Sequence, residues 1–224
     1  MRSRRIKIGF WSASTGSEVS ADQSIQGAPF STADEEYAER LRRLEGARWK
    51  RILNVQAPYR WNLRRLHLGR VLDVGCGIGR NLAHLDPGSV GVDHNAAAVA
   101  VARERGLTAY RVEEFLASQY ARPYTFDSML LAHVVEHMSA SEARDVVSMY
   151  LDYIRPDGRI VFITPQEKGF ASDPTHVRFV GFAELAELAA SLGLRIIDRY
   201  SFPLPRWAGT IFTYNEFNVI ARRR

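Results

Sequence analysis

Short apolar runs alternate with longer stretches of helical periodicity from residue 71 to the C-terminus. Apolar runs bounded by turn residues are typical of buried strands, and apolar positions spaced three and four apart are typical of helices. The strands predicted on this basis are Val71–Val74, Val90–Asp93, Thr108–Val112, Phe126–Ala132, Arg159–Thr164, Leu194–Phe202 and Ile211–Ala221. Since helical segments separate the first five strands, the chain is predicted to form an α/β, doubly wound, Rossmann-like sheet, mostly parallel with an antiparallel C-terminal strand.

The connecting segments carry helix start signals. Asn95 is a good N-cap, and Ser139 with Glu142 forms a capping box. The predicted helices are Asn81–Leu85, Ala96–Arg105, Glu113–Leu116, Ser141–Ile154 and Phe182–Leu192. In such a fold, ligands bind beyond the carboxyl ends of the strands.

The segment before the first strand has a different character. Residues 1–31 mix a short β-like run with many small and polar residues, which predicts a mobile N-terminal arm. Residues 32–224 are predicted to form one domain, with residues 32–69 as its helical cap. The cap helices are expected at Glu35–Leu44, Ala47–Val55 and Tyr59–Leu66. Arg60 and Trp61 lie just upstream of the first strand, so this cap is predicted to act as a lid; the alternative is a solvated basic face.

Composition places the chain among ordinary globular proteins. Its 224 residues are 46% hydrophobic and 11% aromatic, which suits one α/β domain. No apolar run reaches the roughly 18 residues of a membrane span, and no signal peptide is recognised. The single cysteine, Cys76, excludes an internal disulfide and favours a cytoplasmic protein. A net charge of +5 permits an anionic partner, but nucleic acid is the less favoured one.

A glycine-rich stretch follows the first predicted strand. Gly75, Gly77 and Gly79 let a ligand lie directly on backbone at the N-terminus of the next helix. No Lys-Ser/Thr follows, which argues against a phosphate-binding P-loop, and the glycine spacing differs from that of dinucleotide-binding loops. Asp73 inside the strand suits a cationic ligand, and Asp93 at the end of the second strand is placed to hold a ribose diol. The alternative is a plain turn with incidental glycines.

Two motifs together resemble those of the class I S-adenosylmethionine (SAM)-dependent methyltransferases: LDVGCGIGRN at 72–81 and VGVDHN at 90–95. The resemblance extends from about residue 71 to the C-terminus and implies SAM as cofactor. It implies an adenine contact after the third strand, with Glu113 preferred over Glu114, and makes Cys76 a small packing residue of the loop. The implied cofactor-binding residues are Asp73, Gly75, Cys76, Gly77, Gly79, Asp93, His94, Glu113, Glu114, Ala132 and Arg60.

Histidines gather where a SAM methyl group would be presented. His133, Glu136 and His137 follow the fourth strand at spacings that put them on one side of a helical turn. His176 lies in a later polar loop. One carboxylate with two or three imidazoles is a candidate site for a divalent cation, Mg²⁺ or Mn²⁺, and nitrogen ligands shift the preference towards Mn²⁺.

This arrangement resembles a metal-using subset of these methyltransferases, which includes ubiquinone-pathway O-methyltransferases and small-RNA 3′-terminal 2′-O-methyltransferases. They carry Glu-x-x-Glu-His at this point, and the RNA enzymes add a distant histidine. Glu136 and His137 match the second half of the motif, His176 matches the distant histidine, and His133 stands in place of the first glutamate. Two alternatives stay open: a metal-free enzyme with His137 or His133 as general base, and a Glu-His pair that only begins a helix.

The acceptor is predicted to be a sugar hydroxyl. The Arg/Trp/Tyr-containing segment before the glycines and the polar segment Thr164–Phe170 could both contact a glycan. The pattern is also similar to the sugar O-methyltransferases, such as the 1-O-methyltransferase of mycobacterial methylmannose polysaccharide synthesis. The alternatives are an RNA 2′-O-methyltransferase, a methyltransferase of small quinones or phenols, and a non-catalytic SAM-binding module. A homodimer is left open by the N-terminal arm.

Overall fold

The computed structural model of this chain describes residues 56–223. The predicted N-terminal arm (1–31) and the predicted helices Glu35–Leu44 and Ala47–Val55 lie outside the described residues. The division into an arm and a capped domain therefore stays a prediction. Between residues 56 and 223, no helix is both long and apolar enough to cross a membrane.

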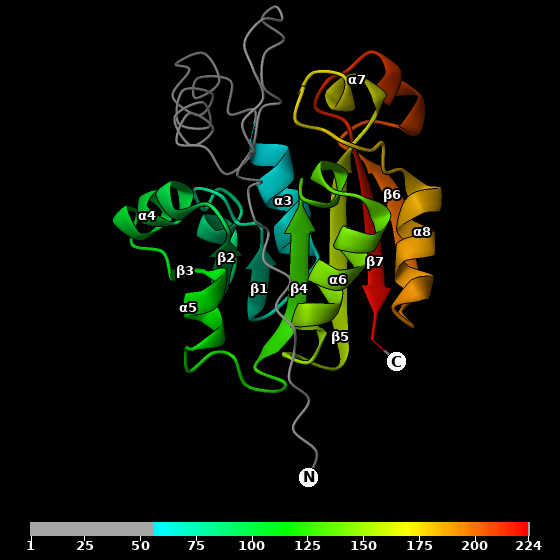
Figure 1. The fold of residues 1–224 in the computed structure, drawn as a ribbon. Helices are drawn as coiled ribbons and strands as arrows, with labels where there is room; N and C mark the ends of the chain where they lie inside the picture. The colour runs from blue at the N-terminus through cyan, green and yellow to red at the C-terminus, as the bar shows by residue number, and fades with distance from the viewer. Residues whose placement is uncertain (1–55, 224) are drawn as a thin grey trace, which may run out of the picture.

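Seven strands form one mixed sheet with the spatial order β3-β2-β1-β4-β5-β7-β6 (Figure 1). They are β1 (Val71–Val74), β2 (Val90–Asp93), β3 (Ala109–Arg111), β4 (Phe126–Ala132), β5 (Ile154–Pro165), β6 (Arg195–Phe202) and β7 (Glu216–Arg222). The pairs among β3, β2, β1, β4 and β5 are all parallel, whereas β7 runs antiparallel between β5 and β6. The predicted α/β, doubly wound, seven-stranded sheet with an antiparallel C-terminal strand is confirmed.

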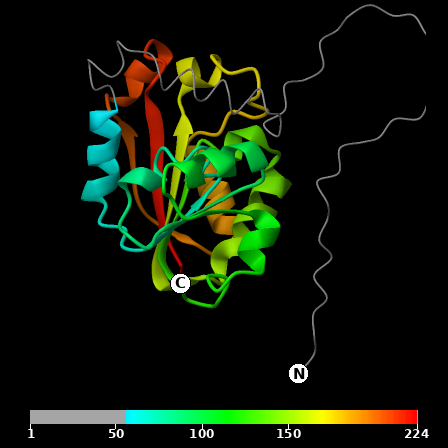
Figure 2. The same cartoon turned by 90° about the vertical axis from the view of Figure 1, so that its left-hand side faces the viewer.

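Helices cover both faces of the sheet (Figure 2). They are α3 (Ala57–Arg65), α4 (Ala96–Glu104), α5 (Val112–Leu116), α6 (Ala140–Leu151), α7 (Glu167–Phe170) and α8 (Phe182–Ser191), with 3-10 turns η1 (Leu82–His84), η2 (Val135–His137) and η3 (Arg206–Thr210). The predicted caps are confirmed, because Asn95 Oδ1 accepts the N–H of Ala98 at 2.9 Å and Ser139 forms a capping box with Glu142.

Alternate residues of the central strands supply the two halves of the core. Met129 and Leu131 of β4 pack under α5, α6 and α8, whereas Leu130 and Ala132 pack on the other face with Leu63 of α3. This two-sided burial explains why these strands read as continuous apolar runs. The carboxyl ends of β1 and β4 therefore meet on a rigid base, at the point where the strand order reverses.

Several predicted elements differ in the structure. The helix expected at Ser141–Ile154 ends at Leu151, and the strand expected at Arg159–Thr164 begins at Ile154, because Ile154 pairs with Phe126 of β4. The helix expected at Asn81–Leu85 is a single 3-10 turn at residues 82–84, because the Pro87–Gly88 turn closes the connection a few residues later. The segment Glu167–Phe170 was expected as loop and forms α7. The last strand begins at residue 216 rather than 211, since η3 and the turns after it occupy the preceding residues.

Candidate functional site

The glycine loop joins β1 to η1 at the carboxyl edge of the sheet. Gly75, Gly77 and Gly79 all have positive φ, at 74°, 52° and 80°. The N–H groups of Gly75 and Cys76 both donate to the carbonyl of Val92, at 2.7 and 3.2 Å, which fastens the loop to β2. Glycine is the residue that adopts this left-handed backbone without steric cost.

Two of these glycines also lie against neighbouring side chains. A Cβ on Gly75 would come within 2.4 Å of Val134 Cγ2, and a Cβ on Gly79 within 2.3 Å of Leu107 Cδ1. The loop is therefore packed tightly against the turn after β4 and the segment before β3. Cys76 is buried, and burial first, followed by the nearby carboxylates, raises the pKa of its thiol, so it is a packing residue rather than a nucleophile.

Asp73 is a buried carboxylate beneath the loop. Its side chain is 1% exposed, and its Oδ2 has no hydrogen-bond partner among the described residues. Burial, and then the charge of Asp93, raise the pKa of Asp73 to about 7. A cation brought next to this carboxylate would favour its ionised form.

Asp93 already accepts backbone hydrogen bonds. Its Oδ2 accepts the N–H of Gly77 at 2.7 Å, and its Oδ1 accepts the N–H of Asn95 at 2.8 Å. His94 Nδ1 lies 3.4 Å from the same Oδ1. Asp93 thus joins the glycine loop to the start of α4, and the second lone pairs of its oxygens remain as acceptors.

The two glutamates after β3 have different surroundings. Glu114 accepts the N–H of Arg111 at 2.9 Å and pairs with the guanidinium of Arg103, and these contacts lower the pKa of Glu114. Glu113 is mostly exposed and lies 3.6 Å from the Arg111 guanidinium. Of the two, Glu113 has the more accessible carboxylate.

The remaining predicted cofactor residues lie on α3 and at the end of β4. Arg60 is half-buried on α3, and Ala132 is the buried last residue of β4. The helix α3 is tied to the sheet by Asn62, whose Nδ2 donates to Asn218 Oδ1 at 2.9 Å and whose Oδ1 accepts from Tyr200 at 2.8 Å.

The structure brings three of the four predicted metal-binding residues together. Glu136, His137 and His176 each offer one ligand atom, and these atoms lie within 4.8 Å of one another. The loop that carries His176 is fastened to η2, because the N–H groups of Val177 and Arg178 donate to the backbone carbonyl of Glu136 at 2.8 and 3.1 Å.

Backbone carbonyls orient both imidazoles. His137 Nδ1 lies 3.1 Å from the carbonyl oxygen of Thr175, and His176 Nδ1 lies 2.8 Å from that of Phe170. Since a carbonyl only accepts, the neutral form of each ring carries its hydrogen on Nδ1 and has its lone pair on Nε2. Burial, with a contribution from the neighbouring His176, lowers the pKa of His137 despite the nearby Glu136 carboxylate, so His137 is neutral at pH 7.

Glu136 supplies a buried negative charge to this group. It is 0% exposed, its Oε1 lies 3.3 Å from His133 Nδ1, and its Oε2 accepts no hydrogen bond from any described residue. An ionised carboxylate out of water is costly unless a cation or hydrogen-bond donors compensate it. The Glu136, His137 and His176 cluster therefore has a donor set that a divalent cation binds, with one buried carboxylate oxygen, Oε2 of Glu136, left without a partner among the described residues.

His133 lies beside this cluster rather than within it. Its Nδ1 is 3.3 Å from Glu136 Oε1, and its Nε2 is 2.9 Å from Oε1 of Glu216, a residue that the sequence analysis did not single out. Burial disfavours the charge, but the hydrogen bonds and charges of the two glutamates outweigh it and raise the pKa of His133 to about 10. Both of its nitrogens thus face carboxylates, which favours the imidazolium form and distinguishes His133 from the three clustered residues.

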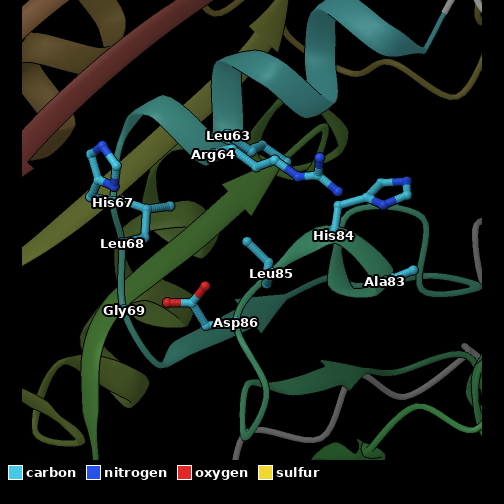
Figure 3. Close-up of a pocket in the computed structure, with 9 residues that line it drawn as sticks. All are labelled: Leu63, Arg64, His67, Leu68, Gly69, Ala83, His84, Leu85 and Asp86. Carbon is cyan, nitrogen blue, oxygen red and sulfur yellow. The ribbon is translucent and has the colours of Figure 1, made fainter.

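A separate cavity of about 530 Å³ opens between α3 and the β1–β2 connection (Figure 3). Its lining residues are Leu63, Arg64, His67, Leu68, Gly69, Ala83, His84, Leu85 and Asp86, none of which is a predicted site residue. In Figure 3, Arg64 extends toward His84, and His67 lies at the opposite end. The short η1 turn, in place of a full helix, leaves this space open.

The strand order and the loop at the carboxyl edge define a fold shared with class I SAM-dependent methyltransferases. One similar solved structure is a SAM-dependent methyltransferase from Archaeoglobus fulgidus, which is 20% identical with a TM-score of 0.61 and aligns over 85% of this chain and 100% of its own. Another is magnesium protoporphyrin IX methyltransferase from Synechocystis PCC 6803 with bound S-adenosylhomocysteine, which is 16% identical with a TM-score of 0.60 and aligns over 86% of this chain and 96% of its own. No curated protein sequence matches the chain.

The sequence itself matches a family defined by a methyltransferase domain, over residues 32–199. The chain belongs to this methyltransferase family, and its fold is the one seen in class I SAM-dependent methyltransferases. The predictions of a methyltransferase and of its class I fold are confirmed at that level.

Proposed function

We propose that this protein is a SAM-dependent O-methyltransferase that acts on a sugar hydroxyl, with a divalent cation held by Glu136, His137 and His176. The observation that carries the proposal is the fully buried Glu136 carboxylate, whose ligand atom lies within 4.8 Å of those of His137 and His176 and whose Oε2 has no hydrogen-bond partner among residues 56–223. A general base or a cation beside the acceptor is needed for an alcohol, whose hydroxyl is a poor nucleophile at neutral pH.

The donor set suits Mn²⁺ or a similar transition ion better than Mg²⁺, because two of its three ligands are nitrogen. When bound, a divalent cation supplies the Lewis acidity that lowers the pKa of an acceptor hydroxyl. The carbonyls of Thr175 and Phe170 fix the orientation of the two imidazoles, as the outer contacts of metal-binding histidines do. His133, as an imidazolium between Glu136 and Glu216, keeps the approach to the cluster polar.

The SAM site is assigned to the edge of β1 and β2. Asp73 lies where a cationic donor is favoured, and Asp93 has lone pairs left for the ribose hydroxyls. Glu113 is the preferred adenine contact because Glu114 is engaged with Arg103 and Arg111. The backbone of Gly75, Cys76, Gly77 and Gly79 forms the surface on which the donor lies, flanked by His94, Ala132 and Arg60.

Methyl transfer forms one bond from the acceptor oxygen to the methyl carbon and breaks the bond from that carbon to sulfur. The electron pair of the broken bond stays on sulfur, so the leaving thioether is neutral and needs no acid. The chain must orient the acceptor and remove the hydroxyl proton. In a metal-free version of the enzyme, the neutral His137 is the general base, since its pKa is lowered while that of His133 is raised to about 10.

A sugar is preferred as acceptor because the cluster is surrounded by polar loops. A small-RNA or a phenol acceptor is the alternative. The single, buried and free cysteine supports a cytoplasmic location. A homodimer is also part of the proposal.

The test is formation of S-adenosylhomocysteine from SAM with mannosides, short RNAs or catechols, each with EDTA or with added Mg²⁺ or Mn²⁺. Turnover of a mannoside that EDTA abolishes and Mn²⁺ restores would support the proposal. The variant Glu136→Gln should then lose turnover at least about 100-fold, while the exposed control Glu187→Gln keeps it. Turnover of RNA alone would overturn the acceptor class, and turnover indifferent to EDTA would overturn the metal site.

A further inference from the structure

Large apolar side chains are exposed at the carboxyl edge of the sheet, beside the proposed acceptor site. Trp207 and Ile211 are 67% and 70% exposed, and Trp61 and Leu204 are also exposed. We call these four residues the apolar rim. Trp61 comes from α3 and the other three from the segment 203–215 between β6 and β7, which lies above the strand ends (Figure 1). Large apolar side chains exposed on neighbouring segments mark a place where something binds.

The two parts of the rim adjoin one another. The ring of Trp61 stacks on Phe202 with centroids 6.2 Å apart, and Phe202 leads directly into the segment 203–215. The hydroxyl of Tyr59 donates to the carbonyl of Tyr214 at 2.6 Å, which ties the same segment to α3 a second time. Figure 2 shows the first turn of α3 and the η3 segment at the same end of the molecule.

A buried polar network holds this segment in place. Asn215 Nδ2 donates to Gln166 Oε1 at 3.0 Å, and Asn215 Oδ1 accepts the N–H of Leu204 at 2.9 Å. Arg206 pairs with Glu167 of α7. Polar groups that are fully satisfied on the inner side while apolar side chains face outward indicate a built surface rather than a collapsed loop.

Two sets of contacts link the segment that carries the rim to the Glu136, His137 and His176 cluster. Glu216, the residue directly after the segment, holds Nε2 of His133 beside that cluster. On the other side, Phe170 of α7 accepts from His176 Nδ1, and α7 packs against η3. An acceptor whose hydroxyl lies at the cluster can therefore extend its remaining part over the rim.

Building on the proposed function, we propose that the acceptor is amphipathic: a glycoside whose sugar hydroxyl lies at the cluster and whose alkyl or aryl aglycone covers Trp61, Leu204, Trp207 and Ile211. A free sugar has no apolar part to cover such a surface, whereas each buried methylene of an alkyl chain is worth about fourfold in affinity. The amphipathic rings of tryptophan suit the junction between a hydroxylated head and an apolar tail.

The experiment compares octyl and methyl glycosides of one sugar, by calorimetric titration of the full chain in the presence of S-adenosylhomocysteine and below the micelle concentration of the octyl compound. The octyl glycoside should bind at least about 10-fold more tightly. The variants Trp207→Ala and Ile211→Ser should reduce this preference to less than about threefold. The matched control is Met149→Ser on α6, which removes an exposed apolar side chain from another element and should keep the preference.

Equal binding of the two glycosides, or a preference that neither variant changes, would overturn the proposal. Binding to lipid vesicles that Trp207→Ala abolishes, without any octyl preference, would assign the rim to a membrane surface and also overturn it. Turnover is recorded separately, so that the two proposals can fail independently. If the octyl glycoside binds more tightly and the variants remove this preference, but no methylation occurs, the rim is supported and the sugar hydroxyl is contradicted as acceptor. If the glycosides are methylated but bind equally well, the sugar hydroxyl is supported as acceptor and the role of the rim is overturned.

Discussion

Glu216 holds His133 across 83 residues of chain, with its Oε1 2.9 Å from His133 Nε2. His133 directly follows the strand β4 and has a positive φ of 59°, an uncommon conformation for a residue with a side chain. Glu216 begins the antiparallel strand β7 and lies opposite Pro165 of β5. This contact thus joins the turn after β4 to the start of β7, which lies on the other side of β5 in the sheet.

Replacing Glu216 by Gln should make stability depend differently on pH. The folded-state pKa of His133 is raised to about 10 from 6.5, so its contribution is fully present below pH 6.5 and is lost as the pH rises through 10. Because His133 is partly exposed, Glu216→Gln should lower the free energy of unfolding by only about 1 kcal/mol at pH 6, and by less at pH 10.5. Urea unfolding at the two pH values checks this, with Glu187→Gln as a control that should show no such difference. An equal loss at both pH values would contradict it.

Asp73→Asn should stabilise the protein without SAM while weakening SAM binding. The pKa of Asp73 is raised from 3.8 to about 7, so the folded state keeps its proton and stability falls as the pH rises between these values. At pH 8 the ionised, buried carboxylate costs up to about 4 kcal/mol, which the asparagine removes, and at pH 4 the two proteins should be equally stable. Denaturation at pH 4 and pH 8 measures the first effect. Calorimetry with SAM measures the second, which should be a loss of about 100-fold; a variant that binds SAM normally would remove Asp73 from the cofactor site.

Gly75 and Gly106 allow the cost of a strained backbone to be measured apart from the cost of a steric clash, because the two have nearly the same φ but different neighbours. Gly75 and Gly106 have φ of 74° and 77°, but a Cβ would meet Val134 at Gly75 and nothing within 4 Å at Gly106. Gly106→Ala should cost about 1 kcal/mol of stability through backbone strain alone. Gly75→Ala should cost about 3 kcal/mol and reduce SAM affinity, since the loop must shift. Equal stabilities of the two variants would show that the Val134 contact is easily relieved.

Glu136→Gln should remove the response of the protein to metal. A ligand present at 100 times its dissociation constant stabilises the folded state by about 2.7 kcal/mol, which corresponds to a rise in melting temperature of about 5 °C or more for the wild type with Mn²⁺. The variant should show no rise. Without metal it should melt at the same or a higher temperature, because a neutral amide is less costly to bury than a carboxylate whose Oε2 has no partner among the described residues. An equal rise for both proteins would place the metal elsewhere.

Much of the fold could be predicted because the central strands are buried on both faces. The observed bounds of β1, β2 and β4 coincide with those predicted from apolar runs. The helix expected after the glycines shortened to η1 because its length depends on where the chain must turn back to β2, not on its own periodicity. The start of β7 was misplaced because a buried network, formed by residues distant in sequence, decides where that strand begins.

The candidate site was predictable where its residues come from single turns. Glu136 and His137 are adjacent, and His176 carried the signal of a histidine in a polar loop. Glu216 gave no such signal, since its contact with His133 depends on the register of β7 against β5. The only hint in the sequence is an acidic residue at the start of a buried strand.

The network of Gln166 and Asn215 has a consequence for selectivity. A segment whose shape is fixed during folding loses little conformational entropy when a ligand arrives, so the binding free energy is not spent on ordering it. A rigid binding surface of this kind selects ligands by shape, so it excludes those that are bulkier or differently branched. A flexible loop would instead adapt to many ligands. Loosening Asn215 should therefore broaden the range of compounds accepted while lowering the affinity for each.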